Sequence, residues 1–407
     1  MLSNNVKQEL NNSIYDNNNV ENLKNSYQND DSNEIMTKKA CKIKEITYAL
    51  FEDENEIIIK EIDNSLQNKN EEEIVIDRVP YVYVWRNILA MIFIHAGAIY
   101  GLYLITKVKS ATLSWTISLL VLGTLGVQAG AHRLWAHKTY KANFYVRLFL
   151  SLCHVLALQN DIYEWSRDHR AHHKFADTNG DPHNSTKGFF FSHVGWLLVK
   201  KHPEVKRRGK TINLDDLLKD PIVVFQRKFY IPMVLIFWGA IPTFVPVLFW
   251  NESLINSFFV CVLFRYALSL NLTWLVNSWS HLYGYRPYDA KMPAVESTVR
   301  HLLMGEGFHN YHHSFPWDYS ASELGAFDVF NPCTAAINFF HWCGWAWDLK
   351  KVSKSMIQSR MKRTGNHEDF NYYKNNTPIY EWITGFASFG GIIFFLKYLQ
   401  SFSNVDD

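Results

Sequence analysis

Eight histidines in this chain form three short motifs whose spacing suits metal binding. The motifs consist of His132 and His137, of His169, His172 and His173, and of His309, His312 and His313. In the second and third motifs the spacing is i, i+3, i+4, which places three imidazoles on one face of a helix. Eight imidazoles exceed the needs of one ion and are about right for two. The sequence therefore predicts a dinuclear metal site.

The residue types alone do not choose the metal, because neutral imidazole suits iron, zinc, copper and nickel. The competing interpretation is that these are ordinary surface or core histidines. A single H-x-x-H-H motif would be weak evidence against it. Two copies and a third motif, each beside a strongly apolar segment, favour the metal site.

Composition indicates that an apolar scaffold positions these motifs. The chain has 407 residues, 15% of them aromatic, and long apolar runs alternate with very polar stretches. A net charge of +2 gives no reason to expect a nucleic-acid partner, and no nucleic-acid-binding motif is evident. The five cysteines include no C-x-x-C pair, so they predict neither a disulfide framework nor a thiolate metal site. This cysteine usage fits machinery that faces a reducing cytosol.

The first 75 residues are rich in Asn, Glu, Lys and Asp. Such a segment buries too little apolar area to offset the entropy of ordering, so residues 1–75 are predicted to be a disordered polar tail. The chain shows no basic-then-apolar signal peptide at its start, so membrane insertion is expected to use an internal span.

Four apolar segments are close to the ~20 residues that cross a bilayer. They cover residues 88–106, 111–131, 229–250 and 254–277. The connections at 107–110 and 251–253 are short and force tight helical hairpins. Pro232, Pro242 and Pro246 predict kinks in the third span, which neighbouring helices can accommodate.

This number of spans places residues 132–228 and 278–350, which contain all three motifs, on one side of the membrane. The first of these segments is strongly basic, so the positive-inside rule assigns that side to the cytosol. Lys107 and Lys109 on the opposite side oppose this only weakly. The expected architecture is an all-α integral membrane protein: a four-helix transmembrane bundle under a helical cytosolic cap that holds the dinuclear site, all within residues 76–350.

Two further apolar stretches are harder to place. Residues 144–158 are too short to cross and contain Arg147, which predicts a helix at the membrane surface beneath the cap. In the C-terminal tail, residues 351–407, the stretch 382–399 is long enough to cross or to lie at the interface. Its glycines and Lys397 favour membrane association without crossing.

Read with their neighbours, the three motifs resemble the membrane-bound acyl-CoA desaturases of the stearoyl-CoA (delta-9) type. The similarity covers residues 79–349 and includes AGAHRLWAH at 129–137, QNDIYEWSRDHRAHHK at 159–174, GFFFSHVGW at 188–196, TWLVNSWSHLYGYRPYD at 273–289 and GEGFHNYHHS at 305–314. The resemblance implies a di-iron centre held by the eight histidines. It adds His281 as a ninth ligand and Asn277 as a group that acts on the metal through water.

The resemblance also implies where the substrate binds. A narrow tunnel that holds the acyl chain would bend at Gln159, Trp165, Thr273 and Trp274 and end near Thr116 and Leu120. The implied contacts of the CoA head are Asn87, Asn160, Arg167, Asp168, Lys200 and Lys201. Alternatives remain for both sets: aromatic packing at a membrane interface for the tryptophans, and solvated charge or lipid-headgroup contact for the lysines.

By resemblance, the expected activity is O2-dependent introduction of a cis double bond at the delta-9 position of stearoyl- or palmitoyl-CoA in the endoplasmic reticulum membrane. Electrons would come from cytochrome b5 and its NADH-dependent reductase, because no fused haem domain is recognisable. The basic run at residues 206–210 is either a docking site for an acidic donor or a solvated loop. Two alternatives stay open: a di-iron desaturase or hydroxylase acting on lipid-linked chains, and a metal-handling membrane protein or transporter. Transporters usually place ionisable ligands near the membrane midplane, whereas these motifs lie at or beyond the helix ends.

Overall fold

The computed structural model describes residues 79–371 and 378–403. These belong to one compact unit that spans Ile76–Asp407. The polar tail predicted for residues 1–75 lies outside the described residues.

Within the described residues, four helices are long and apolar enough to cross a membrane, which confirms the predicted four-span architecture. The first is α4 (Trp85–Leu104), and the second joins α5 (Ser110–Leu125) to the π-helical η1 (Gly126–Ala136). The third comprises α12 (Tyr230–Met233), η4 (Val234–Ala240) and α13 (Ile241–Trp250). The fourth comprises α14 (Leu254–Asn256), η5 (Ser257–Phe264), α15 (Arg265–Asn277) and α16 (Trp279–Leu282).

The second and fourth helices are longer than the apolar segments predicted them to be. They extend over 27 and 29 residues, to Ala136 and Leu282. At 1.5 Å per residue these helices are about 40 Å long, which exceeds the ~30 Å hydrocarbon core. Their extra turns carry His132 and His281 into the cap.

Glycines allow the helices to approach closely. A Cβ at Gly101 of α4 would lie 2.3 Å from the carbonyl oxygen of Phe259 in η5, and one at Gly126 of η1 would lie 2.2 Å from the backbone nitrogen of His154. His154 belongs to α6 (Phe144–Ala157), the short apolar helix predicted at 144–158. Asn143 caps its first turn by accepting a hydrogen bond from Val146 N, and the buried face of α6 packs against α5 and η1.

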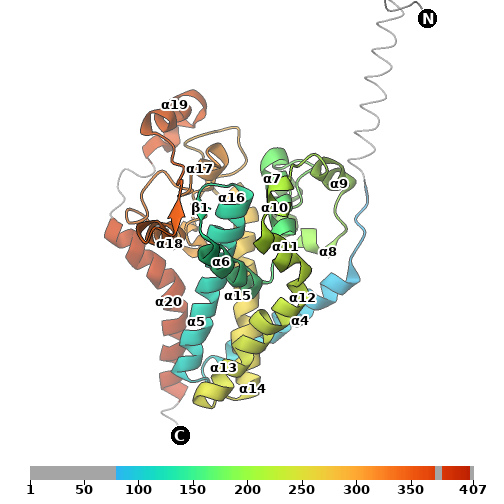
Figure 1. The fold of residues 1–407 in the computed structure, drawn as a ribbon. Helices are drawn as coiled ribbons and strands as arrows, with labels where there is room; N and C mark the ends of the chain where they lie inside the picture. The colour runs from blue at the N-terminus through green and yellow to red at the C-terminus, as the bar shows by residue number, and fades with distance from the viewer. Residues whose placement is uncertain (1–78, 372–377, 404–407) are drawn as a thin grey trace, which may run out of the picture. The chain divides into compact units, whose positions relative to one another are not determined.

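The cap consists of short helices and two small strand pairs (Figure 1). β1 (Lys141–Ala142) pairs antiparallel with β4 (Ala346–Trp347), and β2 (Gly284–Tyr285) pairs with β3 (Glu296–Ser297). The helices are α7 (Ile162–Phe175), η2 (Ser185–Lys187), η3 (Phe191–Gly195), α8 (Trp196–Leu198), α9 (Pro203–Gly209), α10 (Asp215–Leu218), α11 (Pro221–Lys228), η6 (Arg300–Leu303), α17 (His309–Ser314), α18 (Pro332–Trp342), α19 (Lys354–Thr364) and η7 (His367–Asn371).

The last helix, α20 (Pro378–Ser403), contains the apolar stretch predicted at 382–399 and lies alongside α5 (Figure 1). Its 26 residues span about 39 Å, which is long enough to cross a bilayer.

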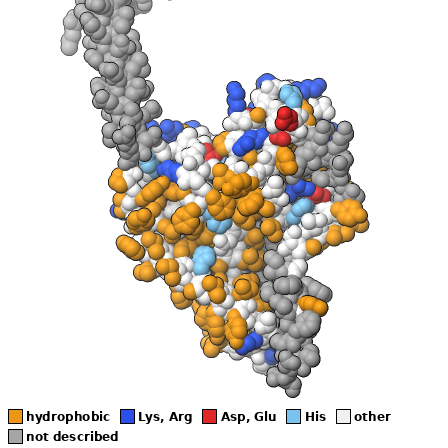
Figure 2. Space-filling view, turned by 180° about the vertical axis from the view of Figure 1, so that it is seen from behind, with side chains coloured by type: hydrophobic (Ala, Val, Ile, Leu, Met, Phe, Trp, Pro, Cys, Tyr) orange, Lys and Arg blue, Asp and Glu red, His pale blue; other side chains and the backbone are white. Residues whose placement is uncertain are grey.

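Exposed apolar side chains mark the surface that faces lipid. Figure 2 shows hydrophobic side chains covering the bundle, whereas Lys and Arg gather on the cap and at the opposite end. Leu89, Ile92 and Phe93 of α4 are 59–62% exposed, and Leu248 and Phe249 of α13 are 73% and 78% exposed. A soluble protein rarely exposes an apolar surface this large. The chain is therefore a multi-pass membrane protein.

Candidate metal centre and adjoining cavity

Four separate elements bring nine imidazoles together at the cap end of the bundle. The second span ends in η1 and supplies His132 and His137, and α7 supplies the middle motif. The fourth span ends in α16, which supplies His281, and α17 carries the last motif. Asp161 starts α7 by accepting a hydrogen bond from Glu164 N, and α7 packs against η1.

The imidazoles form two groups within which the nitrogens lie no more than 4.8 Å apart. The five-imidazole group consists of His132, His137, His169, His173 and His312. The four-imidazole group consists of His172, His281, His309 and His313. Two groups of this size match the two-ion prediction in number, and their side chains include all eight histidines of the three motifs.

Within each group, Nε2 atoms face one another at short range. The distances are 2.9 Å between His132 and His312, 2.8 Å between His137 and His169, and 3.0 Å between His173 and His312. His309 Nε2 lies 3.1 Å from the Nε2 atoms of both His281 and His313.

Carboxylates on the far side of three rings fix which nitrogen carries the proton. Glu306 lies 3.1 Å from His132 Nδ1, Asp181 lies 2.8 Å from His172 Nδ1, and Asp177 lies 2.8 Å from His281 Nδ1. A carboxylate accepts a hydrogen bond from Nδ1–H and so keeps the proton on that nitrogen, which leaves a lone pair on Nε2 of the neutral ring. Lone pairs that converge in this way repel one another unless a cation lies between them. The donor set therefore fits bound metal ions.

Burial keeps the remaining rings in the form that binds metal. The pKa values of His137, His169, His173 and His313 are held well below the usual value by burial and then by neighbouring imidazoles. Metal binding requires the neutral ring, so this electrostatic environment favours a metal centre.

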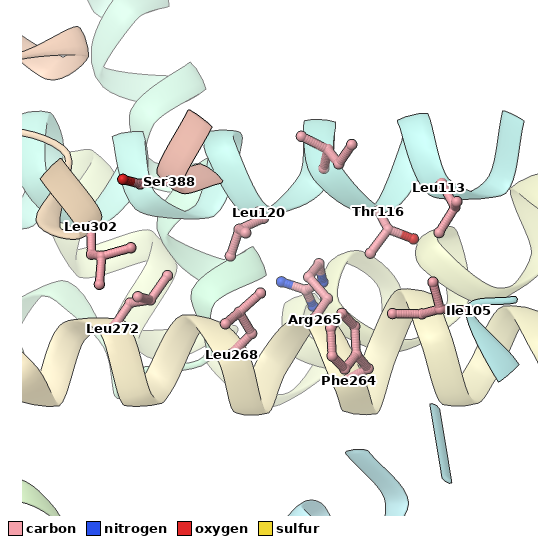
Figure 3. Close-up of a pocket in the computed structure, with 11 residues that line it drawn as sticks. Ile105, Leu113, Thr116, Leu120, Phe264, Arg265, Leu268, Leu272, Leu302 and Ser388 are labelled. Carbon is pink, nitrogen blue, oxygen red and sulfur yellow. The ribbon is translucent and has the colours of Figure 1, made fainter. Parts of the chain in front are cut away.

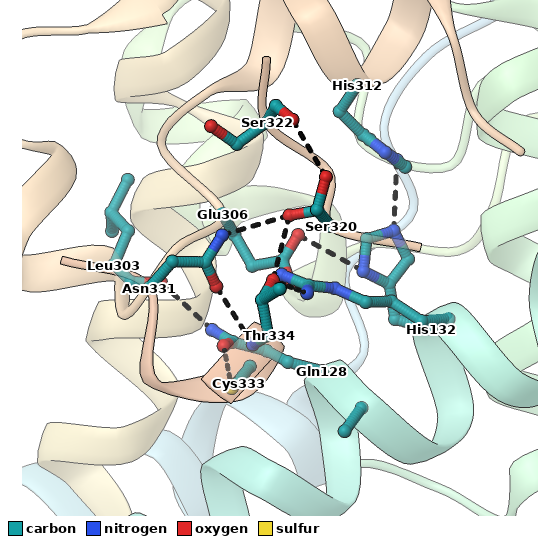
Figure 4. Close-up of polar contacts among 12 residues, drawn as sticks. Gln128, His132, Leu303, Glu306, His312, Ser320, Ser322, Asn331, Cys333 and Thr334 are labelled. Carbon is teal, nitrogen blue, oxygen red and sulfur yellow. Dashed lines mark hydrogen bonds and ion pairs between the residues drawn. The ribbon is translucent and has the colours of Figure 1, made fainter. Parts of the chain in front are cut away.

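A buried polar network holds the Glu306 carboxylate in place (Figure 4). Arg133 donates to Glu306 Oε1 at 2.7 and 3.1 Å and to Thr334 Oγ1 at 2.7 Å. Burial raises the pKa of Glu306, but Arg133 and His132 outweigh it and lower that pKa to about 2. Asn331 accepts a hydrogen bond from Thr334 N, which ties the start of α18 to the same network. The metal centre is thus braced by residues outside the histidine motifs.

A cavity of about 240 Å³ adjoins the five-imidazole group through His169. Most of the residues predicted for the acyl chain and part of the CoA head line it, together with Asn277: Asn87, Gln159, Asn160, Trp165, Asp168, Thr273 and Trp274. The structure brings these side chains together in one cavity, here called the central cavity. Thr116 and Leu120, which were predicted to lie near the end of the tunnel, line a separate cavity.

Hydrogen bonds fix a corner in the central cavity. Gln159 donates to Thr273 Oγ1 at 2.9 Å and accepts a hydrogen bond from Trp165 Nε1 at 3.3 Å. The Trp165 ring stacks on the imidazole of His169 at 4.8 Å. The backbone on either side of Gln159 turns sharply, with φ of 48° at Leu158 and 66° at Asn160. The corner therefore lies directly against the metal centre.

The three basic residues predicted for the CoA head lie outside the central cavity. Arg167 and Lys201 line an adjacent depression of about 830 Å³, which shares Asp168 with the central cavity. Both are held by Asp168, with Arg167 Nη2 3.0 Å from its carboxylate and Lys201 in close contact. Lys200 lines a third depression of about 310 Å³, which Lys201 also borders. The predicted contacts thus extend from the metal centre to a basic surface.

The basic run at 206–210 is partly neutralised. Glu204 pairs with Arg208 at 3.0 Å and with Arg207, whereas Lys206 and Lys210 line the same depression as Arg167.

The sequence motifs alone did not reveal the carboxylates that orient the rings. Glu306 precedes the last motif by three residues, and Asp177 and Asp181 follow the middle motif closely. An acidic residue within a few positions of each i, i+3, i+4 motif was the available signal. His183, outside the three motifs, contacts Asp181 at 3.4 Å. His193 instead bonds to Ser278 and Asn271 of the fourth span.

The fold and this site agree with a known family. The family model described as "Fatty acid desaturase" matches residues 110–327, which is more than half of the chain. The chain belongs to the fatty acid desaturase family.

Several relatives are about half identical to it. The acyl-CoA Delta-9 desaturase of Acheta domesticus is 52% identical over 307 residues, which cover 74% of this chain and 85% of the relative. The stearoyl-CoA desaturases of Bos taurus and Homo sapiens are 54% and 53% identical, and each alignment covers 70% of this chain and 79% of the relative.

Proposed function

We propose that this protein is an acyl-CoA delta-9 desaturase that introduces a cis double bond into stearoyl- or palmitoyl-CoA. The observation that carries this proposal is a pair of convergent imidazole groups, one of which, the five-imidazole group, borders a cavity whose corner lies against His169. The names of the relatives support the substrate class and the position of the new bond.

Two iron ions would be held by the five-imidazole and four-imidazole groups, with Asn277 acting through water beside them. When bound, they supply the O2-dependent removal of hydrogen from unactivated methylenes, which no acid or base side chain can perform. The all-imidazole donor set is compatible with iron.

The residues of the central cavity orient the chain for this chemistry. The Gln159–Thr273 hydrogen bond and the ring of Trp165 hold the bend next to His169, so the bend determines which carbons face the metal centre. Trp274 is 3% exposed and forms a rigid apolar wall. A corner that is fixed by hydrogen bonds and walled by aromatic rings favours one chain geometry.

The charged and amide groups at the surface would bind the CoA head. Asn160 and Asn87 line the central cavity, and Asn87 donates to the carbonyl of Leu197 at 2.8 Å. Arg167, Lys200 and Lys201 supply cations for phosphates. Asp168 holds Arg167 and Lys201 at the mouth of the cavity.

Cytochrome b5 and its NADH-dependent reductase are the proposed electron donors, and the endoplasmic reticulum is the proposed membrane, with the cap in the cytosol. The basic segment 132–228 supports this orientation through the positive-inside rule.

Expression in a desaturase-deficient cell tests the proposal, with double-bond positions read by mass spectrometry. We expect growth without added oleate and a cis bond at delta-9. Membranes given defined stearoyl-CoA, cytochrome b5 and reductase should form the same product. Activity on lipid-linked chains but not on acyl-CoA would favour the related desaturases or hydroxylases. Purified protein that contains zinc and has no oxidase activity under any reducing condition would favour a metal-handling role.

A further inference from the structure

A second cavity lies inside the bundle, on the face of α15 opposite to the central cavity. Its lining on this side comprises Phe264 at the end of η5 and Arg265, Leu268 and Leu272 of α15, whereas the central cavity is lined by Tyr266, Leu270, Thr273, Trp274 and Asn277 of α15. At 100° per residue, Leu268 and Leu270 point about 200° apart around the helix. The second cavity is here called the bundle slot.

The bundle slot is narrow, elongated and apolar. Leu113, Thr116, Ile117 and Leu120 follow an i, i+3, i+4, i+7 spacing, so they form one stripe of α5 that faces α15. Figure 3 shows the slot running between the two helices, from Leu272 and Leu302 at one end to Leu113 and Ile105 at the other. Eight residues of helix separate Phe264 from Leu272, which corresponds to a length of about 12 Å.

Arg265 is the charged residue of the lining, but its polar contacts are with backbone. Its Nε donates to the carbonyl of Cys261 at 2.8 Å and its Nη1 donates to the carbonyl of Leu156 at 3.0 Å. Leu156 lies in the last turn of α6, where carbonyl groups lack helical partners. Arg265 therefore ties α15 to α6.

The size of the slot argues against an independent ligand. Its volume is about 50 Å³, whereas cavities that hold whole small molecules measure roughly 300–1,000 Å³. A space of this size and lining suits the end of a hydrocarbon chain whose remainder lies elsewhere. Leu272 at one end is the immediate neighbour of Thr273, which forms the corner of the central cavity.

The outer wall of the slot includes α20, a helix beyond the region that matches the family model. Ser388 of α20 contributes to the lining, and the family match ends at residue 327. η6 contributes Leu302 to the slot, and the two residues before it, Arg300 and His301, hold Glu381 of α20. His301 Nε2 lies 2.9 Å from the Glu381 carboxylate, and Arg300 is in closer contact.

Aromatic packing fixes α20 at the same level. Phe330 lies 5.2 Å from the ring of Trp382 and 5.7 Å from that of Phe386. A Cβ at Gly385 would lie 2.1 Å from the Phe330 ring, so this position requires glycine for the approach. An ion pair and a close aromatic contact therefore hold Ser388 against the slot.

We propose that α20 is a specificity element that walls the bundle slot and limits the length of the acyl chain whose methyl end enters it. This inference rests on the proposed function. Ser388 sits on the slot beside Leu302, so its size determines how much of the slot remains open. Arg300, His301 and Glu381 act as positioning residues, since they hold α20 without lining the slot.

The test compares Ser388→Trp with Ala387→Trp. Ala387 is the exposed neighbour on the same helix, so its variant adds the same side chain away from the slot. Both are assayed in membranes with myristoyl-, palmitoyl- and stearoyl-CoA. One methylene in an apolar pocket changes selectivity about 10-fold or more. We therefore expect Ser388→Trp to lower the stearoyl-to-myristoyl turnover ratio at least about 10-fold, and Ala387→Trp to leave it unchanged.

A third variant, Ile117→Trp, fills the slot from α5. If it shifts the ratio and Ser388→Trp does not, α20 is not part of the wall and the inference fails. If neither shifts the ratio while the delta-9 product still forms, the slot does not receive the chain, and the proposed function stands alone. If Ser388→Trp is inactive with every substrate, its preference for chain length is measured instead from how much each acyl-CoA stabilises the purified protein. Equal stabilisation by the three chain lengths in that variant and in wild type would also overturn the inference.

Discussion

The five-imidazole and four-imidazole groups are similar in composition but differ in how they are enclosed. All four imidazoles of the four-imidazole group are buried, and two of them are oriented by carboxylates, Asp181 and Asp177. In the five-imidazole group, three rings are only partly buried. A single carboxylate, that of Glu306, orients one of its rings, and His169 borders the central cavity.

This difference indicates a division of labour between two halves of one centre. The four-imidazole group is sealed and firmly oriented, which favours tight retention of its ion. The five-imidazole group is open toward the corner at Trp165, which favours access for the reacting chain. The predictions below perturb one group at a time, so that metal content and turnover can be compared between them.

The largest effect is expected from removing one imidazole of either group. His172→Ala and His169→Ala should each lower turnover by more than the 10–100-fold typical of outer partners. Each should also reduce the metal content mainly at its own group, which metal analysis of the purified protein measures. His341→Ala provides the control, because His341 bonds to the carbonyl of Ala346 outside both groups. Full metal content and wild-type turnover in His172→Ala would exclude His172 as a ligand.

A smaller loss is expected when a carboxylate that orients a ring is neutralised. Asp181→Asn leaves the size of the side chain unchanged but weakens its hold on His172 Nδ1, and should lower metal affinity or activity about 10–100-fold. Competition with a chelator measures the affinity. Asp328→Asn is the matched control, since Asp328 accepts a hydrogen bond from Gly325 in a loop away from the imidazoles. Equal metal retention in both variants would argue against an orienting role for Asp181.

Much of this architecture could be predicted from the sequence, because the membrane imposes simple rules on it. Four apolar segments of about 20 residues predicted four spans, and the structure confirms them. Counting spans predicted that all three motifs lie on one side, and the structure brings their imidazoles together. The ends of the second and fourth spans were predicted too early, because η1 and α16 continue past the apolar residues into the cap.

Contacts between residues distant in sequence could not be predicted from the motifs. His281 stands alone in its segment, so only the resemblance indicated its role. The pairing of Asp177 with His281 joins residues 104 positions apart, and that of Arg133 with Glu306 joins residues 173 apart. Such pairs depend on how the cap folds over the bundle. The position of α20 is a similar case, since an apolar stretch does not specify which helices it will contact.

The buried ion pair of the five-imidazole group should make stability depend on acid. The pKa of Glu306 is about 2 in the folded protein and 4.5 ordinarily, so folding favours the ionised carboxylate. Its stabilisation is therefore complete above pH 4.5 and is lost as the pH falls toward about 2. Glu306→Gln should destabilise the protein by about 3–5 kcal/mol near neutral pH, because it leaves Arg133 without a counter-charge.

Thermal unfolding in detergent across this pH range measures the effect. The gap between wild type and Glu306→Gln should narrow steadily as the solution is acidified below pH 4.5. A gap of constant size down to the acid limit of the assay would show that the Glu306 charge contributes nothing to folding.

The smallest effect on turnover is expected from a change at the corner of the central cavity, where the acyl chain would lie beside the metal centre. Thr273→Val keeps the shape of the side chain but removes the oxygen that accepts a hydrogen bond from Gln159. A hydrogen bond of this kind contributes about 0.5–1.5 kcal/mol, so turnover should fall only about 2- to 10-fold. The metal content should not change, because Thr273 touches neither group. The bend, however, should loosen, and a minor product with a displaced double bond should appear in the mass spectrum.

Thr243→Val is the control, since its hydroxyl bonds to Gly239 within the third span. If Thr273→Val gave a single delta-9 product at the wild-type rate, the Gln159–Thr273 contact would not set the bend, and the position of the new bond would have to be fixed by the tryptophan walls alone.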